Sequence, residues 1–239
     1  MTSELWWKMQ DRNVAAESRL VNVLRAAVQQ VAGAEISSEA ETGSLIVASA
    51  AASVPGAEQA GVSLLYADGA IESQSISDES IREVDQLQAQ FREGPCVTAL
   101  WDEHTVAVDD MVAESWRWPR FAPAAVELGV GSMLSFQLYA RESSLGALNL
   151  YAGQARSFGP EARTLGGLFA MHAAASLGEA RHVAQLQEAL ASRDVIGQAK
   201  GILMERFGID AEQAFNMLAR SSQETNMKLT AVARWLTDF

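Results

Sequence analysis

The spacing of apolar residues near the start of the chain follows the period of a helix. Apolar side chains such as Leu20 and Leu24 recur at intervals of three and four residues within the segment 11–31, which places them on one face. Gly33 and a polar stretch then interrupt the pattern. We therefore expect an amphipathic N-terminal helix within residues 1–35.

From residue 61 onward the pattern changes to short strand-like segments between turns. Five such segments predict β-strands, at 61–66, 70–77, 105–110, 131–139 and 144–151. The two-residue turn Asp68-Gly69 and the short connection 141–144 are typical of hairpins. Because hairpins join antiparallel strands, an antiparallel-rich sheet fits this pattern better than a doubly wound parallel sheet.

Helical segments are expected before and between these strands. One spans 44–53 and stops before a Pro-Gly turn, a second spans 78–91 with Asp78 as its N-cap, and a third spans about 119–128. Strands and helices are thus mixed, and the helices flank an antiparallel sheet. The expected fold class of this part is α+β.

After Pro160 the sequence can remain helical as far as Phe207. A helix of about 47 residues would be about 70 Å long, longer than a small domain, so we expect it to connect two parts. Five glycines leave a bend and a continuous rod equally open; they are Gly166, Gly167, Gly178, Gly197 and Gly201. The apolar seam of Val183, Leu186 and Leu190 suits a dimer contact but is too short to establish a coiled coil.

The last 32 residues predict two short helices. Asp210 is a good N-cap with Gln213 three residues later, as in a capping box, and the buried face of this helix is assigned to Phe215, Leu218 and Ala219. Thr225-Asn226 breaks the helix, and another follows with Leu229, Val232, Ala233 and Leu236 on one face. With the end of the long helix, these segments predict an all-α unit of three helices.

Composition narrows the classes of function. The 239 residues carry a formal net charge of −12, most of it before residue 186, so that the last segment is nearly neutral. Phosphate affinity normally comes from clustered Lys and Arg, so the acidic balance argues against nonspecific nucleic-acid binding but leaves a local site open. The 49% of hydrophobic residues suffices for a core and excludes a disordered chain.

Membrane, metal and enzyme classes are not expected. No apolar run reaches the ~20 residues of a membrane-spanning helix and the start lacks signal-peptide features, so we expect a cytoplasmic protein with no membrane partner. One cysteine, Cys96, and three scattered histidines predict neither disulfides nor a metal site. Cys96, His104 and Asp109 fit no nucleophile signature, and there is no P-loop or G-x-S-x-G motif, so we expect no enzyme.

Three motifs occur in the last segment. They are I-x-x-A-K-G with Ile196, Ala199, Lys200 and Gly201, A-F-x-x-L with Ala214, Phe215 and Leu218, and K-L-x-x-V-A with Lys228, Leu229, Val232 and Ala233. With these motifs, residues 192–236 resemble the ANTAR domain, the RNA-binding output module of bacterial transcription antiterminators. The resemblance implies RNA as a partner.

Upstream, three strings support a second resemblance. They are EGPCVTAL at 93–100, VDD at 108–110 and LGALNLYA at 145–152. They are similar to the GAF domain that precedes ANTAR in many actinobacterial regulators, over roughly 40–182. The resemblance implies a helix-flanked antiparallel sheet whose pocket, in other members, takes a small molecule or a chromophore. We divide the chain into an N-terminal helix (1–35), a GAF sensor domain (36–182) and an ANTAR domain (183–239).

Lys200 is the centre of the RNA surface that the ANTAR resemblance implies. Its small neighbours Ala199 and Gly201 would let an RNA loop approach closely. Spacing alone favours another interpretation, in which the small residues permit helix packing and Lys200 is a solvated charge. The candidates for RNA binding are Arg193, Lys200, Gly201, Arg220, Ser221, Asn226 and Lys228.

The candidate ligand pocket of the GAF domain comprises Phe91, Cys96, Trp101, Met133 and Phe136. Aromatic side chains can line such a pocket or simply fill it as core, and the sequence leaves both open. For Cys96 a buried core position is the better interpretation, because no neighbouring cation in the sequence lowers its pKa as a redox thiol or chromophore attachment point requires. No cofactor is predicted, and the ligand is unidentified.

Together these features predict an RNA-binding transcription antiterminator that is regulated through a GAF domain and binds hairpins in nascent mRNA leaders. A homodimer through the linker helix is expected, with a signal at the GAF domain shifting the population of two states. The alternative is a small-molecule or redox sensor whose helical tail only dimerises or contacts a protein partner.

Overall fold

The computed structural model describes residues 38–140 and 143–238. The chain divides into two compact units, one ending at Arg181 and the other beginning at His182. The helix predicted within residues 1–35 lies outside the described residues.

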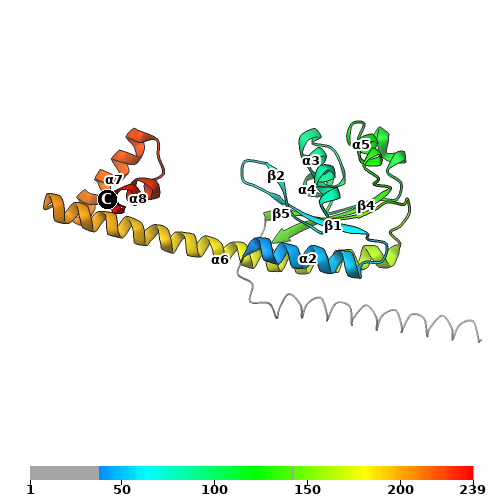
Figure 1. The fold of residues 1–239 in the computed structure, drawn as a ribbon, viewed down its shortest axis with the longest axis horizontal. Coiled ribbons are helices and arrows are strands. Elements are labelled where there is room, and N and C mark those ends of the chain that lie inside the picture. Colours follow the sequence, from blue (N-terminus) through cyan, green and yellow to red (C-terminus); the bar gives the residue numbers. More distant parts are fainter. Residues whose placement is uncertain (1–37, 141–142, 239) are drawn as a thin grey trace, which may run out of the picture. The chain divides into compact units, whose positions relative to one another are not determined.

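A five-stranded sheet forms the centre of the first unit (Figure 1). Its strands are β1 (Gln59–Leu65), β2 (Ile71–Ile76), β3 (Thr105–Val108), β4 (Ser132–Ala140) and β5 (Ser143–Ala152), in the order β2-β1-β5-β4-β3. Every neighbouring pair is antiparallel, including the two predicted hairpins β1-β2 and β4-β5. The antiparallel sheet expected from the sequence is thus confirmed.

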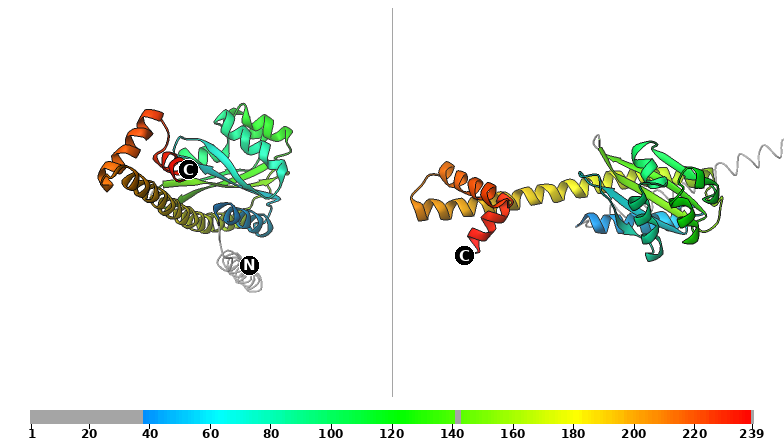
Figure 2. Two further views of the ribbon diagram at one scale, coloured as in Figure 1. Left: turned by 60° about the vertical axis from the view of Figure 1, so that its left-hand side comes forward. Right: turned by 90° about the horizontal axis from the view of Figure 1, so that it is seen from above.

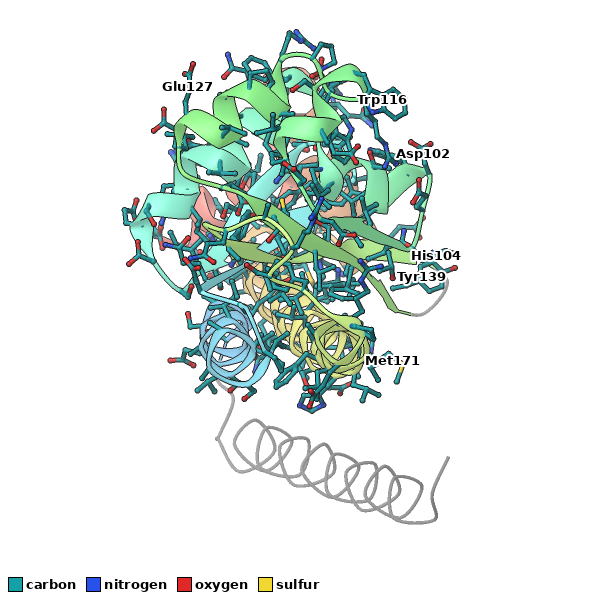
Figure 3. All side chains as sticks on the ribbon, turned by 90° about the vertical axis from the view of Figure 1, so that its right-hand side faces the viewer. Asp102, His104, Trp116, Glu127, Tyr139 and Met171 are labelled. Carbon is teal, nitrogen blue, oxygen red and sulfur yellow. The ribbon has the colours of Figure 1, made fainter. Side chains whose placement is uncertain are left out.

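Helices cover both faces of this sheet. They are α2 (Glu39–Ser53), α3 (Arg82–Phe91), α4 (Pro95–Trp101) and α5 (Phe121–Glu127), with short 3₁₀ helices at Glu79–Ile81 and Val112–Trp116. On one face α2 lies beside the first turns of α6 (Pro160–Phe207), as Figures 2 and 3 show. The helices α3, α4 and α5 lie on the other face (Figure 1).

Alternation along the strands sends side chains into two cores. Leu134, Phe136 and Leu148 pack with α2 and α6, whereas Met133 and Tyr151 pack on the opposite face with residues of α3 and α5. Successive strand residues point to opposite faces of a sheet, so this division follows from the strand period.

Two helices of the first unit differ from the prediction. α2 begins five residues earlier than expected, because the Ser38 hydroxyl accepts a hydrogen bond from the Glu41 N–H and caps the helix. α4 was missed, since seven residues are too few to show a helical period. Gly94, with φ of 114°, turns the chain into α4, and Pro95 occupies its first position.

The predicted helix at 78–91 forms as a 3₁₀ turn followed by α3. The Asp78 carboxylate accepts a hydrogen bond from the Ser80 N–H and caps the turn, as expected. The predicted helix at 119–128 is the shorter α5.

α6 is a single α-helix of 48 residues, so none of its glycines ends the helix. The glycines on it differ in their surroundings. A Cβ at Gly166 would lie 2.5 Å from the Phe136 ring, so close packing of α6 on the sheet requires glycine there. At Gly197 and Gly201 a Cβ would meet nothing within 4 Å.

The second unit consists of the end of α6 with α7 (Ala211–Thr225) and α8 (Leu229–Thr237). Asp210 and Gln213 form the predicted capping box at the start of α7. The core contains Ala199, Leu203, Ala214, Leu218, Val232 and Ala233. The assignment of Phe215 to the buried face is wrong: Ala214 and Leu218, four residues apart, face the core, and Phe215 is 41% exposed.

Candidate RNA interface and sensory site

The second unit carries a stripe of solvent-accessible residues on α6. Arg193, Gly197, Lys200 and Gly201 are four, three and one residues apart, which places them on one side of the helix. Arg193 and both glycines are exposed, and Lys200 is half-buried. Ala199 is fully buried in the core of the unit. Only Ala199 therefore serves helix packing, whereas Gly201 leaves open space beside Lys200.

The other RNA candidates lie at the end of α7 and in the turn to α8. The Arg220 guanidinium donates to the Glu224 carboxylate at 2.7 Å, and this hydrogen bond raises the pKa of Arg220. Asn226, with φ of 53°, ends α7 in the left-handed conformation, and exposed Lys228 precedes α8. Ser221 is half-buried near the end of α7.

The five pocket candidates of the first unit do not come together. Phe136 packs on the α2 and α6 face, whereas Met133 is buried and Phe91 partly buried under the helices of the other face. Cys96 is buried in a small cluster with Leu100 and Ala147. Trp101 alone of the five lines an open hollow, described below.

A cluster of buried polar side chains joins the sheet to α3 and α4. Its centre is Asp85, 5% exposed, which accepts hydrogen bonds from the Ser73 hydroxyl at 2.9 Å and from the Tyr151 hydroxyl. Asn149 donates to Asp85 and accepts from Ser135 at 2.8 Å. Gln88 donates to Asp85 at 3.5 Å and accepts the Cys96 backbone N–H at 2.8 Å, which links α3 to α4.

The cluster changes the acidity of its members. Burial raises the pKa of Asp85, although the hydrogen bonds from Tyr151 and Ser73 oppose this shift. Burial, with the nearby Asp85 charge, raises the pKa of the Cys96 thiol to about 12. Since the thiolate is the reactive form, Cys96 stays an unreactive thiol at neutral pH. The pKa of Tyr151 is also raised, by burial first and by Asp85 second.

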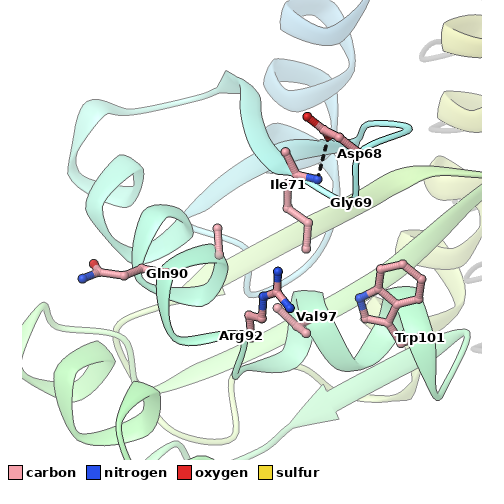
Figure 4. Close-up of a pocket in the computed structure, with 9 residues that line it drawn as sticks. Asp68, Gly69, Ile71, Gln90, Arg92, Val97 and Trp101 are labelled. Atoms are coloured by element: carbon pink, nitrogen blue, oxygen red, sulfur yellow. Dashed lines mark hydrogen bonds between the residues drawn. The ribbon is translucent and has the colours of Figure 1, made fainter.

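Beside this cluster lies an open hollow of about 770 Å³ (Figure 4). The tip of the β1-β2 hairpin, the end of α3 and one side of α4 surround it. Its lining residues are Asp68, Gly69, Ala70, Ile71, Ala89, Gln90, Arg92, Val97 and Trp101. Sequence reasoning missed Arg92 and Asp68 as lining residues, because only the folded domain places the hairpin tip and the end of α3 around one hollow.

Comparison with known families identifies both units. Residues 36–177 match the GAF domain family, and residues 184–236 match the ANTAR domain family. The chain belongs to the GAF family. An ANTAR domain follows the GAF domain, as the resemblance implied. A GAF domain is a sensory module and an ANTAR domain is an RNA-binding antitermination module, so the chain is a regulator of transcription.

Solved structures support the fold of the GAF domain. The GAF domain of an Acinetobacter phosphoenolpyruvate-protein phosphotransferase matches with a TM-score of 0.56 and 16% identity, over 70% of this chain and 97% of that one. The GAF domain of the Coxiella burnetii enzyme matches with a TM-score of 0.56 and 17% identity, over 70% of this chain and 98% of that one. Free methionine-R-sulfoxide reductase from Neisseria meningitidis matches with a TM-score of 0.55 and 16% identity, over 69% of this chain and 91% of that one. At these identities the likeness shows the fold alone.

A comparison with curated proteins gives no match. Among residues 38–140 and 143–238, no helix is long and apolar enough to cross a membrane. The same residues contain no group of three or more His, Cys, Asp or Glu side chains placed to hold a metal ion.

Proposed function

We propose that this GAF–ANTAR chain is a transcription antiterminator that binds hairpins in nascent mRNA leaders through its ANTAR domain and acts as a homodimer. The observation that carries the proposal is the solvent-accessible stripe on α6 within the ANTAR match, where Arg193 and Lys200 flank Gly197 and Gly201 follows Lys200. Two cations with open space between them suit a phosphate backbone and the unpaired bases of a loop.

Ser221 and Asn226 at the end of α7 and Lys228 before α8 supply further hydrogen-bond donors and acceptors for such a loop. Arg220 contributes less, since RNA has to compete with Glu224 for its guanidinium. The nearly neutral ANTAR domain accordingly binds a particular RNA structure rather than any RNA.

The dimer is supported by the stretch of α6 that precedes the stripe. Every residue from 183 to 191 is exposed, so this stretch has no tertiary packing within the described chain. Helices without such packing are marginally stable in water. Val183, Leu186 and Leu190 form an exposed apolar seam on the side of α6 that continues into Arg193 and Gly197. A second copy paired along this seam would bring two RNA stripes close together, which suits two hairpins in one leader.

The rival interpretation as a redox sensor lacks a reactive group at Cys96, because burial holds its thiol protonated. A GAF domain that senses a small molecule remains part of the proposal, with RNA binding as the output.

The test compares the transcripts that crosslink to the full-length protein in its native cell with those that crosslink to Lys200→Ala. Leader regions with tandem hairpins should be enriched about tenfold over background by the unaltered protein. The Lys200→Ala variant should lose this enrichment, because a charge-assisted contact contributes a large share of the binding free energy of a small interface.

Arg206→Ala is the matched control, since Arg206 is exposed on the same helix but on a different side from Lys200. It should retain the enriched transcripts. If the folded, unaltered protein enriches no RNA above background, the proposed function is wrong and the tail acts through protein contacts.

A further inference from the structure

The interior of the GAF domain is occupied by its own side chains where α3 and α4 cover the sheet. Asp85, Asn149 and Tyr151 satisfy one another there, and the Gln88 carbonyl oxygen accepts the N–H of Cys96. Buried polar groups with complete hydrogen bonding need no ligand to stabilise them. A ligand of this GAF domain is therefore expected beside the cluster rather than in it.

The open hollow offers the groups that a ligand needs. Arg92 extends its guanidinium into the hollow, and within the described residues no carboxylate forms an ion pair with it (Figure 4). Trp101 lies across from it with 60% of its surface exposed, and Ile71 and Val97 provide apolar surface between them. The volume of about 770 Å³ suits a small molecule.

We propose that this hollow is the ligand site of the GAF domain and binds a small molecule with a planar apolar ring and one anionic carboxylate or phosphate group. A guanidinium matches either oxyanion with two parallel hydrogen bonds. The exposed indole of Trp101 stacks on the ring. Asp68 sets the orientation: its carboxylate, which accepts the Ala70 N–H at 3.0 Å, disfavours the anionic end of the ligand at the hairpin and directs it to Arg92.

The elements that line the hollow also carry the buried cluster. Val97 follows Cys96 in α4, and Ala89 follows Gln88 in α3, so the hydrogen bond from Cys96 to Gln88 joins the two walls of the hollow. β2 contributes Ile71 to the hollow and Ser73 to Asp85. A bound ligand thus contacts three elements that the cluster holds together. The ligand of the hollow is the input signal of the sensory domain. Only this regulatory role, and not the binding of the ligand, rests on the proposed function.

The test titrates the full chain with naphthalene-2-carboxylate, which has a planar ring and one carboxylate, and follows the indole N–H signals by NMR. The chain has six tryptophans, and the signal of Trp101 is the one that disappears in Trp101→Phe. The Trp101 signal should shift and saturate. Arg92→Gln should weaken binding about tenfold, as the loss of a charge-assisted hydrogen bond does. The neutral naphthalene-2-carboxamide should bind the unaltered chain about tenfold more weakly.

Arg163→Gln and Trp116→Phe are the matched controls, because both residues lie outside the hollow; Figure 3 shows Trp116 on the outer surface. Each should bind the carboxylate as the unaltered chain does, and the backbone amide spectrum of every variant should keep the dispersion of the folded chain, with changes confined to the neighbours of the substituted residue. The proposal would be overturned if the Trp101 signal showed no saturable shift. It would also be overturned if Arg92→Gln bound the carboxylate as tightly as the unaltered chain does and bound the amide with the same affinity. RNA binding is measured separately without the probe, so that a failed RNA test leaves the ligand site intact and the reverse also holds.

Discussion

Asp85→Leu should lower the free energy of unfolding of the GAF domain by at least about 2 kcal/mol, because two of the donors it leaves, Tyr151 and Asn149, are fully buried. The substitution leaves the hydroxyls of Tyr151 and Ser73 and the amide of Asn149 without their buried acceptor. Each buried donor without a partner costs about 1–3 kcal/mol. Urea unfolding followed by tryptophan fluorescence, to which buried Trp118 contributes, measures the loss. A change below about 1 kcal/mol would show that the cluster does not hold the helices on the sheet.

Asp85→Asn separates the charge from the hydrogen bonds. The shape and one acceptor oxygen remain, but no ionisable group is left. Because burial raises the pKa of Asp85 above its usual 3.8, the folded domain binds this proton more tightly than the unfolded chain does. The contribution of Asp85 to stability is therefore complete at pH values below 3.8 and is lost as pH rises through the raised pKa.

The free energy of unfolding of the unaltered chain minus that of Asp85→Asn should thus fall as the pH rises from 4 toward 8, so that the variant gains stability relative to the unaltered chain. Urea unfolding at a series of pH values measures this difference, in which the titration of the other carboxylates cancels. A difference that is constant across the range, or one that shifts in favour of the unaltered chain, would contradict a raised pKa of Asp85.

The sheet and the ANTAR helices could be predicted because their signals are local. The alternation of 131–139 and the turn at Asp68-Gly69 define β4 and the first hairpin without distant contacts. The capping box of Asp210 and Gln213 likewise marks the start of α7. α4 carries no comparable signal, since the turn at Gly94 and only seven residues define it.

The five pocket candidates do not line one pocket, and the period of a β-strand explains why. Met133 and Phe136 are three residues apart in β4, so they point to opposite faces of the sheet and cannot line one pocket. Asp85 was missed because a carboxylate in a helix normally lies at the surface, and only the fold brings Ser73, Asn149 and Tyr151 around it. The RNA candidates rest on the motifs of the last segment and stay predictions, whereas no local pattern marks residues that only tertiary contacts bring together.

The double variant Leu186→Glu, Leu190→Glu should make the chain monomeric and reduce its affinity for a two-hairpin RNA about 100-fold. Acidic side chains in the apolar seam repel those of a second copy, and a monomer loses the avidity that links two binding events. Light scattering gives the mass, and fluorescence anisotropy gives the affinity for RNAs with one and two hairpins.

Affinity for a single hairpin should stay unchanged in this variant, because Arg193 and Lys200 remain in place. The control Ala184→Glu, Ala191→Glu adds the same charge at exposed positions on other sides of α6, and it should stay dimeric with full affinity. If the seam variant weakens binding to one hairpin as much as to two, its effect is charge repulsion of RNA, and the seam does not pair two ANTAR domains. If it remains a dimer, the two copies meet through another surface.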